Sequence, residues 1–293
     1  LYQTLLAAGQ THYRLDLAHT RMNEGNALLR LNHPDEALAR YREAVETYQT
    51  LVGEGQDCLS ELALTWMNEG NALHTLDRPN EALARYREAV GLYENLIAAG
   101  QLQYRPNLAL TWMNEGNTIR ALARPKESLV CYREAAELYR DLIDEGHIQY
   151  RPNLACTRMN EGFALFTLNR SDEALARYRE AADLYGNLIT VGQSRYRLNL
   201  VNIRINEGIA LNSLQRPADA HTCYQLALDV WEGAEAMPAD ALDTAPYFAA
   251  LIAVTRSAVG FAARVERLTQ EVARALGGVA PQNLGRFYPS AEQ

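Results

Sequence analysis

The stretch MNEGNA at residues 67–72 decides the fold, because the same six residues also stand at 22–27. Successive copies of this block are 45, 46, 46 and 46 residues apart, and the later, diverged copies begin at Met113, Met159 and Ile205. A second block, YREA, keeps the same step and begins at Tyr41, Tyr86, Tyr132 and Tyr178. A fixed period of this length predicts a solenoid, in which each unit buries its apolar face against its neighbours.

The residues of one unit, 105–146, predict two helices joined by a short turn. Pro106 suits the first turn of a helix, and Trp112, Gly116 and Ile119 recur at the spacing of one helical face. Pro125 suits the start of a second helix with a buried stripe made of Leu129, Tyr132, Ala135, Leu138 and Leu142. Each unit is therefore an expected antiparallel helical hairpin.

A glycine is expected to end each second helix in the left-handed conformation. The glycines at this repeat position are Gly55, Gly100, Gly146 and Gly192.

Composition and charge exclude several classes of protein. The net charge of −8 and the acidic residues near most arginines leave no concentrated basic face for nucleic acid. No run approaches the roughly 18 apolar residues of a membrane span, and no signal peptide opens the chain. The pair Leu1-Tyr2 matches Leu92-Tyr93, so the sequence is expected to begin inside a repeat, with sequence missing upstream.

Residues for catalysis or metal binding do not form a recognisable pattern. The sequence lacks a glycine-rich phosphate loop, an HExxH motif and a nucleophile elbow. The four cysteines, Cys58, Cys131, Cys156 and Cys223, have no CxxC spacing and are expected to be reduced thiols of a cytoplasmic protein. We therefore predict no enzyme, no metal and no cofactor.

The unit resembles the tetratricopeptide repeat, in a long variant of about 46 residues. That family has a Trp, a Gly and a large residue in its first helix, then an Ala, an aromatic residue and an Ala in its second. The matching residues are Trp66, Gly70, Leu73, Ala82, Tyr86 and Ala89. The resemblance implies an all-α, right-handed superhelical solenoid whose first helices line a concave groove.

The resemblance and the period together divide the chain. Residues 1–234 are predicted to form the repeat array, with a half repeat at 1–9 followed by five repeats. Residues 235–278 are a degenerate copy of the repeat. They are expected to cap the end of the solenoid, because a stack of repeats needs a terminal unit that covers its exposed end. Residues 279–293 are expected to be a loosely ordered tail.

Asparagines recur on the side of the first helix opposite the Trp and Gly, which in this family lines the groove. A carboxamide carries both an acceptor and donors, so a row of them can hold an extended peptide backbone. We predict peptide binding by the row Asn23, Asn68, Asn114, Asn160 and Asn206, and by Asn26, Asn71 and Asn117 beside it. The alternative interpretation is that these side chains bridge adjacent first helices or survive from recent duplication.

Two apolar sets extend the predicted peptide site. Met67, Met113 and Met159 occupy one repeat position at the edge of the groove, where methionine would be an adaptable contact. Their alternative role is packing between first helices. Towards the C-terminal end the groove turns apolar at Phe163, Phe166 and Ile209, which indicates an interaction site unless the superhelix buries them.

A glutamate precedes each repeat glycine, where the family usually has a large apolar residue. The row is Glu24, Glu69, Glu115, Glu161 and Glu207. An unpaired buried carboxylate is costly, and arginines are available, so we predict a structural ion-pair ladder. The alternative is an acidic wall that attracts a basic ligand.

The leading hypothesis for function is a protein-interaction scaffold that binds an extended peptide or partner segment in the groove, without nucleic acid or membrane. The alternative is a structural or regulatory repeat arm of a larger signalling or effector chain whose other domain lies upstream of residue 1. The sequence does not indicate the oligomeric state.

Overall fold

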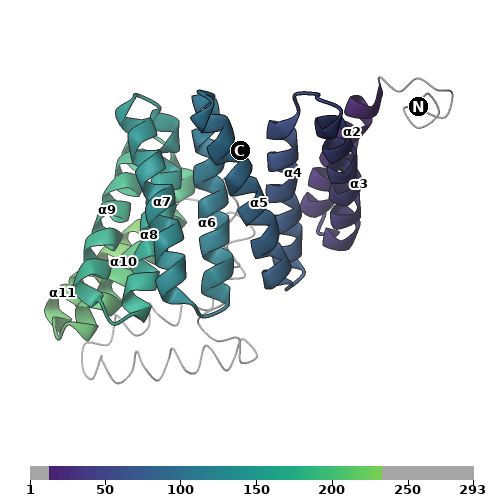
Figure 1. Ribbon diagram of the computed structural model, residues 1–293. Coiled ribbons are helices and arrows are strands. Elements are labelled where there is room, and N and C mark those ends of the chain that lie inside the picture. The colour runs from purple at the N-terminus through teal and green to yellow at the C-terminus, as the bar shows by residue number, and fades with distance from the viewer. Residues whose placement is uncertain (1–12, 233–293) are drawn as a thin grey trace. The chain divides into compact units, whose positions relative to one another are not determined.

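A computed structural model describes residues 13–232, which are almost entirely helical and contain no strand (Figure 1). The α-helices of this part of the chain are α2 (Arg14–Arg30), α3 (Pro34–Gly53), α4 (Leu59–Thr75), α5 (Pro79–Ala98), α6 (Arg105–Ala121), α7 (Pro125–Asp144), α8 (Arg151–Thr167), α9 (Ser171–Thr190), α10 (Arg197–Ser213) and α11 (Pro217–Glu232). Short 3₁₀ turns precede α6, α8 and α10 at Leu102–Tyr104, Ile148–Tyr150 and Ser194–Tyr196. The half repeat at 1–9, the cap at 235–278 and the tail at 279–293 lie outside the described residues.

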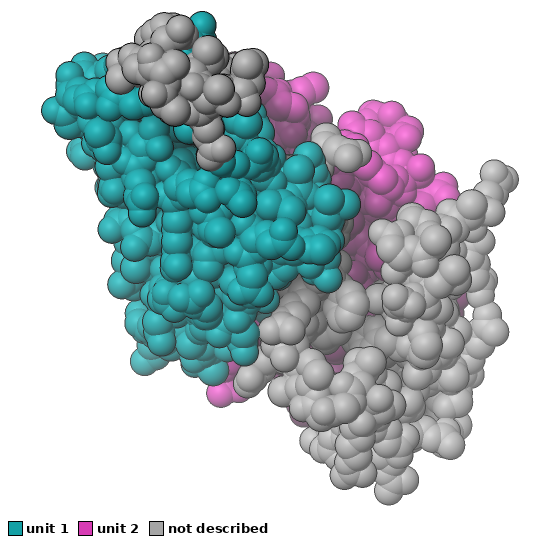
Figure 2. Space-filling view, turned by 90° about the vertical axis from the view of Figure 1, so that its right-hand side faces the viewer, with its two compact units in different colours: residues 1–138 teal, residues 139–293 magenta. Residues whose placement is uncertain are grey.

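The helices alternate as first and second members of hairpins, as the repeat predicts. The chain forms two compact units, which divide after Leu138 within α7 (Figure 2). In the first unit α3 packs on α2 and α4, and α5 packs on α4 and α6. In the second unit α9 packs on α8 and α10, and α11 packs on α10. Within the units the first helices also meet directly, α4 with α2 and α6 and α8 with α10, so each unit has a layer of first helices and a layer of second helices.

The second helices end as predicted. The amide N of Gly100 donates to the carbonyl O of Ile97 at 2.9 Å, and the N of Gln101 donates to the O of Leu96 at 3.0 Å. These bonds make a Schellman cap, which needs a left-handed residue, and Gly100 supplies it with φ +89°. Gly55, Gly146 and Gly192 adopt the same conformation.

The first helices end in the same kind of cap without glycine, which the sequence did not lead us to predict. Positive φ angles of 55–61° occur at Asn32, Asp77, Ala123, Asn169 and Gln215. Asn and Asp tolerate this conformation best, because their short polar side chains bond locally. The described hairpins therefore turn through a left-handed residue that is not glycine. The next helix begins two residues later, with Pro34, Pro79, Pro125 or Pro217 in four hairpins and with Ser171 in the hairpin of α8 and α9.

In every described hairpin a tyrosine ring of the second helix lies directly against a glycine of the first helix. A Cβ added to Gly70 would lie 2.6 Å from Cε1 of Tyr86, closer than any real contact allows. Tyr86 is 1% exposed, so its ring has no room to retreat. The same relation holds for Gly25–Tyr41, Gly116–Tyr132, Gly162–Tyr178 and Gly208–Tyr224.

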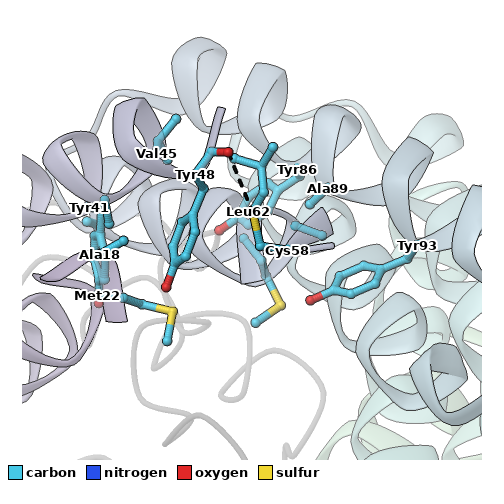
Figure 3. Packing of buried hydrophobic residues seen from close by; sticks show 14 of the residues in the cluster. Ala18, Met22, Tyr41, Val45, Tyr48, Cys58, Leu62, Tyr86, Ala89 and Tyr93 are labelled. Atoms are coloured by element: carbon cyan, nitrogen blue, oxygen red, sulfur yellow. Dashed lines mark hydrogen bonds between the residues drawn. The ribbon is translucent and has the colours of Figure 1, made fainter. Parts of the chain in front are cut away.

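Buried tyrosines, alanines and leucines make the core between the two helix layers. In the first unit Tyr48 and Tyr93 are fully buried beside Ala89 and Leu62 (Figure 3). The thiol of Cys58 bonds to the carbonyl oxygen of Tyr48 at 3.7 Å (Figure 3). All four cysteines are free thiols, as expected.

The glycine–tyrosine contact gives a first prediction. Gly70→Ala should lower the free energy of unfolding by about 1–3 kcal/mol, because overpacking must displace the Tyr86 ring. Gly91→Ala is the matched control, since nothing lies within 4 Å of the position a Cβ would take in α5. That change should raise stability by about 1 kcal/mol through helix propensity. Chemical denaturation measures both, and equal effects of the two substitutions would contradict the close contact.

Candidate functional site

Helical spacing places two asparagines of each early repeat on one side of its first helix. Asn23 and Asn26 on α2 are three residues apart, as are Asn68 and Asn71 on α4 and Asn114 and Asn117 on α6. Asn23 is exposed, Asn68 is 8% exposed and the other four are half-buried. We call this side of α2, α4 and α6, with these six asparagines, the amide face.

In the first three repeats, the buried tyrosine that lies on the repeat glycine hydrogen-bonds to the asparagine following that glycine. The hydroxyl of Tyr86 donates to Oδ1 of Asn71 at 2.8 Å. The equivalent distances are 2.8 Å for Tyr41–Asn26 and 2.9 Å for Tyr132–Asn117. A buried hydroxyl needs such an acceptor, because leaving it unpaired would cost about 1–3 kcal/mol.

The same asparagine oxygens accept a second bond from the next repeat. Nδ2 of Asn68 donates to Oδ1 of Asn26 at 3.1 Å, and Nδ2 of Asn114 donates to Oδ1 of Asn71 at 3.0 Å. The asparagines therefore do bridge adjacent first helices, which was the alternative interpretation of the pattern. A further bond of this kind, 3.0 Å long, joins Oγ1 of Thr118 on α6 to Nδ1 of His74 on α4.

The sequence contained a signal for the tyrosine–asparagine bonds that the repeat analysis missed. Each of the three pairs is 15 residues apart, and the two blocks that carry them were interpreted separately. Most buried tyrosine hydroxyls have a hydrogen-bond partner, so a constant spacing to an amide was a signal for the pair.

The second unit carries the remaining polar candidates, Asn160 and Asn206. Asn160 on α8 is 5% exposed and its Nδ2 lies 4.0 Å from Sγ of Cys156. Asn206 on α10 is half-buried. Here Phe163 and Ile209 replace the asparagine that follows the glycine in the first unit.

The apolar candidates differ in exposure. Phe163, Phe166 and Ile209 are half-buried, and Ile209 packs against the cluster of Val201, Ile205 and Ala227. The candidate methionines are almost completely buried: Met67 is 1%, Met113 5% and Met159 2% exposed. This burial favours their alternative role, packing between first helices, over contact with a ligand.

The glutamate row forms the predicted ion-pair ladder. One set of pairs joins the second helix of a repeat to the first helix of the next repeat. The Nε–Oε1 distances are 3.2 Å for Arg42–Glu69, 3.1 Å for Arg87–Glu115 and 3.2 Å for Arg179–Glu207. Pairs within one first helix add Arg21–Glu24 at 2.7 Å, Arg158–Glu161 at 2.5 Å and Arg204–Glu207 at 2.7 Å.

In the pairs that join two helices, the carboxylate end is buried and the guanidinium end is exposed. The side chains of Glu69 and Glu115 are each 4% exposed, whereas those of Arg42 and Arg87 are 48% and 59% exposed. The free energy cost of forming the pair therefore comes mainly from removing the carboxylate from water. An acidic wall open to a basic ligand does not fit this burial.

Glu115 has fewer partners than Glu69. Glu69 lies near Arg85 as well as Arg42, with 3.7 Å between Arg85 Nε and Glu69 Oε1. At the repeat position of Arg85 the third repeat has Cys131, and Oε2 of Glu115 is buried without a hydrogen-bond partner. Burial raises the pKa of Glu115, against the hydrogen bond and charge of Arg87. Burial, followed by the charge of Glu115, also raises the pKa of the Cys131 thiol to about 12.

The raised pKa gives a second prediction. A carboxyl whose pKa is higher in the folded state destabilises the fold once pH exceeds its ordinary value of about 4.3, because the unfolded chain ionises first. Glu115→Gln should therefore raise the melting temperature at pH 7 and leave it unchanged near pH 4. Gln retains an oxygen that can accept from Arg87. Melting curves across this pH range measure the effect.

Glu127→Gln is a control of opposite sign. Its pKa is lowered, chiefly by the hydrogen bond from Arg124, so its contribution to stability is present at pH 7 and lost as pH falls. If Glu115→Gln instead lowers the melting temperature at pH 7, the ionised Glu115 stabilises the fold, and the raised pKa assigned to Glu115 is wrong.

Two negative findings concern residues 13–232. No three His, Cys, Asp or Glu side chains within that range are arranged to hold a metal ion. None of the helices described there combines the length and the apolarity needed to cross a bilayer.

Comparison with known proteins identifies the fold. Residues 17–57 match the family model described as tetratricopeptide repeat. Similar solved structures include BtubC (BKLC) from P. vanneervenii, with a TM-score of 0.62, 18% identity and coverage of 80% of this chain and 88% of that one. The apo form of RapI has a TM-score of 0.67 and 12% identity, over 88% of this chain and 84% of RapI.

A putative kinesin light chain from P. anserina with nearly identical TPR-like repeats is also similar. Its TM-score is 0.57 at 10% identity, over 74% of this chain and 95% of that chain. No curated protein sequence matches this chain closely enough to indicate a relative. The resemblance to tetratricopeptide repeats is thus confirmed, and the fold is an all-α, TPR-like solenoid of helical hairpins.

Proposed function

We propose that this chain of tetratricopeptide-like repeats is a protein–protein interaction scaffold that binds an extended segment of a partner along its first helices. The observation that carries the proposal is the amide face. The same carboxamide chemistry recurs there at a constant repeat step, partly exposed, on helices that are fixed to one another by hydrogen bonds. A rigid, periodic array of polar groups suits a ligand that is itself periodic, such as a polypeptide backbone.

The residues around the amides favour recognition of backbone over recognition of charged side chains. The positions beside them on α4 are Leu64 and Thr75, and on α6 they are Leu110 and Ala121, all uncharged. The equivalent positions on α2 are His19 and Arg30. The charged ladder of glutamates and arginines lies at the junction with the second helices. On α4 and α6, a ligand would therefore meet amide groups flanked by these uncharged side chains.

The proposed contacts in the first unit are Asn23, Asn26, Asn68, Asn71, Asn114 and Asn117. In the second unit they are Asn160, Asn206, Phe163, Phe166 and Ile209. The methionines are not among the proposed contacts. Side chains that are at most 5% exposed pack beneath the surface and offer a ligand little area.

The third prediction tests this function with a random library of displayed peptides, selected on the chain. The double substitution Asn26→Asp and Asn71→Asp keeps oxygens that can accept the tyrosine and asparagine bonds but removes the amide donors. We expect the double variant to melt close to the parent and to bind the selected peptides about tenfold more weakly, a loss of about 1.4 kcal/mol.

Asn80→Asp with Asn95→Asp is the matched control, because both residues are exposed on α5 and the change of charge is the same. The control variant should bind the peptides as the parent does. Selected peptides that bind both variants equally well would place the site elsewhere, and a failure to select any peptide would refute the proposed function.

A further inference from the structure

The hydrogen bonds already made on the amide face restrict what a ligand can offer. Oδ1 of Asn71 accepts from the Tyr86 hydroxyl at 2.8 Å and from Nδ2 of Asn114 at 3.0 Å. Oδ1 of Asn26 is used in the same way, by Tyr41 and by Asn68. Two bonds fill the two lone pairs of an amide oxygen, so Asn26 and Asn71 have only their NH₂ groups to give a ligand. The ligand must therefore supply hydrogen-bond acceptors at Asn26 and Asn71.

Aliphatic side chains lie on the same side of the helices as these amide donors. Leu64 lies one helical turn before Asn68, and Leu110 lies one turn before Asn114, so each leucine shares the side of its helix with the amides. Both leucines are half-buried. On α4 and α6, the amide face therefore combines NH₂ donors with a patch of aliphatic surface.

The spacing of the rungs sets the period of the ligand. Packed helices lie about 8–10 Å apart, and the direct asparagine bonds show that the first helices are packed neighbours. A polyproline II helix rises about 3.1 Å per residue with three residues per turn, so it presents the same side every 9 Å or so. The length of one polyproline II turn therefore matches the distance between the first helices of neighbouring repeats.

Other backbone conformations fit this period poorly. A β-strand rises about 3.3 Å per residue, so three residues span about 10 Å, but the third side chain points to the opposite face. An α-helix repeats its face after seven residues and about 10 Å, but its carbonyl groups are bonded within the helix and cannot accept from the amides. The polyproline II backbone has no internal hydrogen bonds, so its carbonyls are free to accept.

We propose that the amide face of the first unit binds a proline-rich segment in the polyproline II conformation, one turn per repeat. Backbone carbonyls of the ligand accept from the NH₂ groups of Asn26 and Asn71, and proline rings lie on Leu64 and Leu110. Proline has no N–H, so it leaves no donor unpaired opposite amide oxygens that are already filled. This inference rests on the proposed function for its location and adds the class of ligand.

The fourth prediction uses labelled peptides of about 15 residues as probes. A peptide of repeated Pro-Pro-Ala triplets should bind at least about tenfold more tightly than a Gly-Ser-Ala peptide of equal length, because its conformation is already ordered. Fluorescence anisotropy gives the dissociation constants. A helix-forming peptide of Glu-Ala-Ala-Ala-Lys blocks should bind no better than the Gly-Ser-Ala peptide.

The site is tested with the Asn26→Asp and Asn71→Asp double variant and its matched Asn80→Asp and Asn95→Asp control. The first should weaken binding of the Pro-Pro-Ala peptide about tenfold, and the second should not. Side-chain amide resonances of the parent protein test the same contact without a substitution. Those of Asn26 and Asn71 should shift when the Pro-Pro-Ala peptide is added.

The outcomes separate this inference from the proposed function. One outcome is that selected library peptides bind through the amide face, while the protein binds the Pro-Pro-Ala and Gly-Ser-Ala probes with equal affinity. That outcome would overturn the polyproline II ligand and leave the scaffold function standing. Unshifted Asn26 and Asn71 resonances at saturating Pro-Pro-Ala peptide would also overturn it. If neither the library nor the probes bind, the proposed function fails first.

Discussion

Each hairpin of the structure depends on a tyrosine ring that lies directly on a glycine. The ring reaches the first helix only because the glycine has no Cβ, and this depth buries its hydroxyl among the helices. The buried hydroxyl requires an acceptor, which the asparagine after the glycine supplies in the first three repeats. That asparagine then accepts from the next repeat, so the contact that closes one hairpin also determines how two hairpins join.

This chain of requirements explains which features were predictable from sequence. The fixed period, the prolines and the glycine caps gave the hairpins and their limits, because helix ends depend on local chemistry. The glutamate ladder followed from the cost of a bare buried carboxylate. The burial of the methionines was not predictable, because a helical wheel shows direction from one axis only, while burial at Met67 depends on neighbouring helices that the wheel does not contain.

The ion-pair ladder also shows how drift between copies changes chemistry without changing the fold. Arg85 and Cys131 occupy the same repeat position, yet Arg85 lies beside a glutamate as a cation and Cys131 lies there as a thiol with a raised pKa. The hairpin tolerates the exchange, because the glycine–tyrosine contact persists at Gly116 and Tyr132. The partners of a buried group were therefore less predictable than its position, since one substitution on a facing helix alters them.

Structural and ligand-binding interpretations of the asparagines do not exclude each other. A carboxamide separates its acceptor from its donors, and in Asn26 and Asn71 the fold uses the acceptor. Bonds that hold the oxygen also fix the plane of the amide, so the NH₂ group points in one direction before a ligand arrives. A donor that is already oriented loses little conformational entropy on binding. The bonds that make these asparagines structural are thus the same bonds that would make them effective, and selective, as donors.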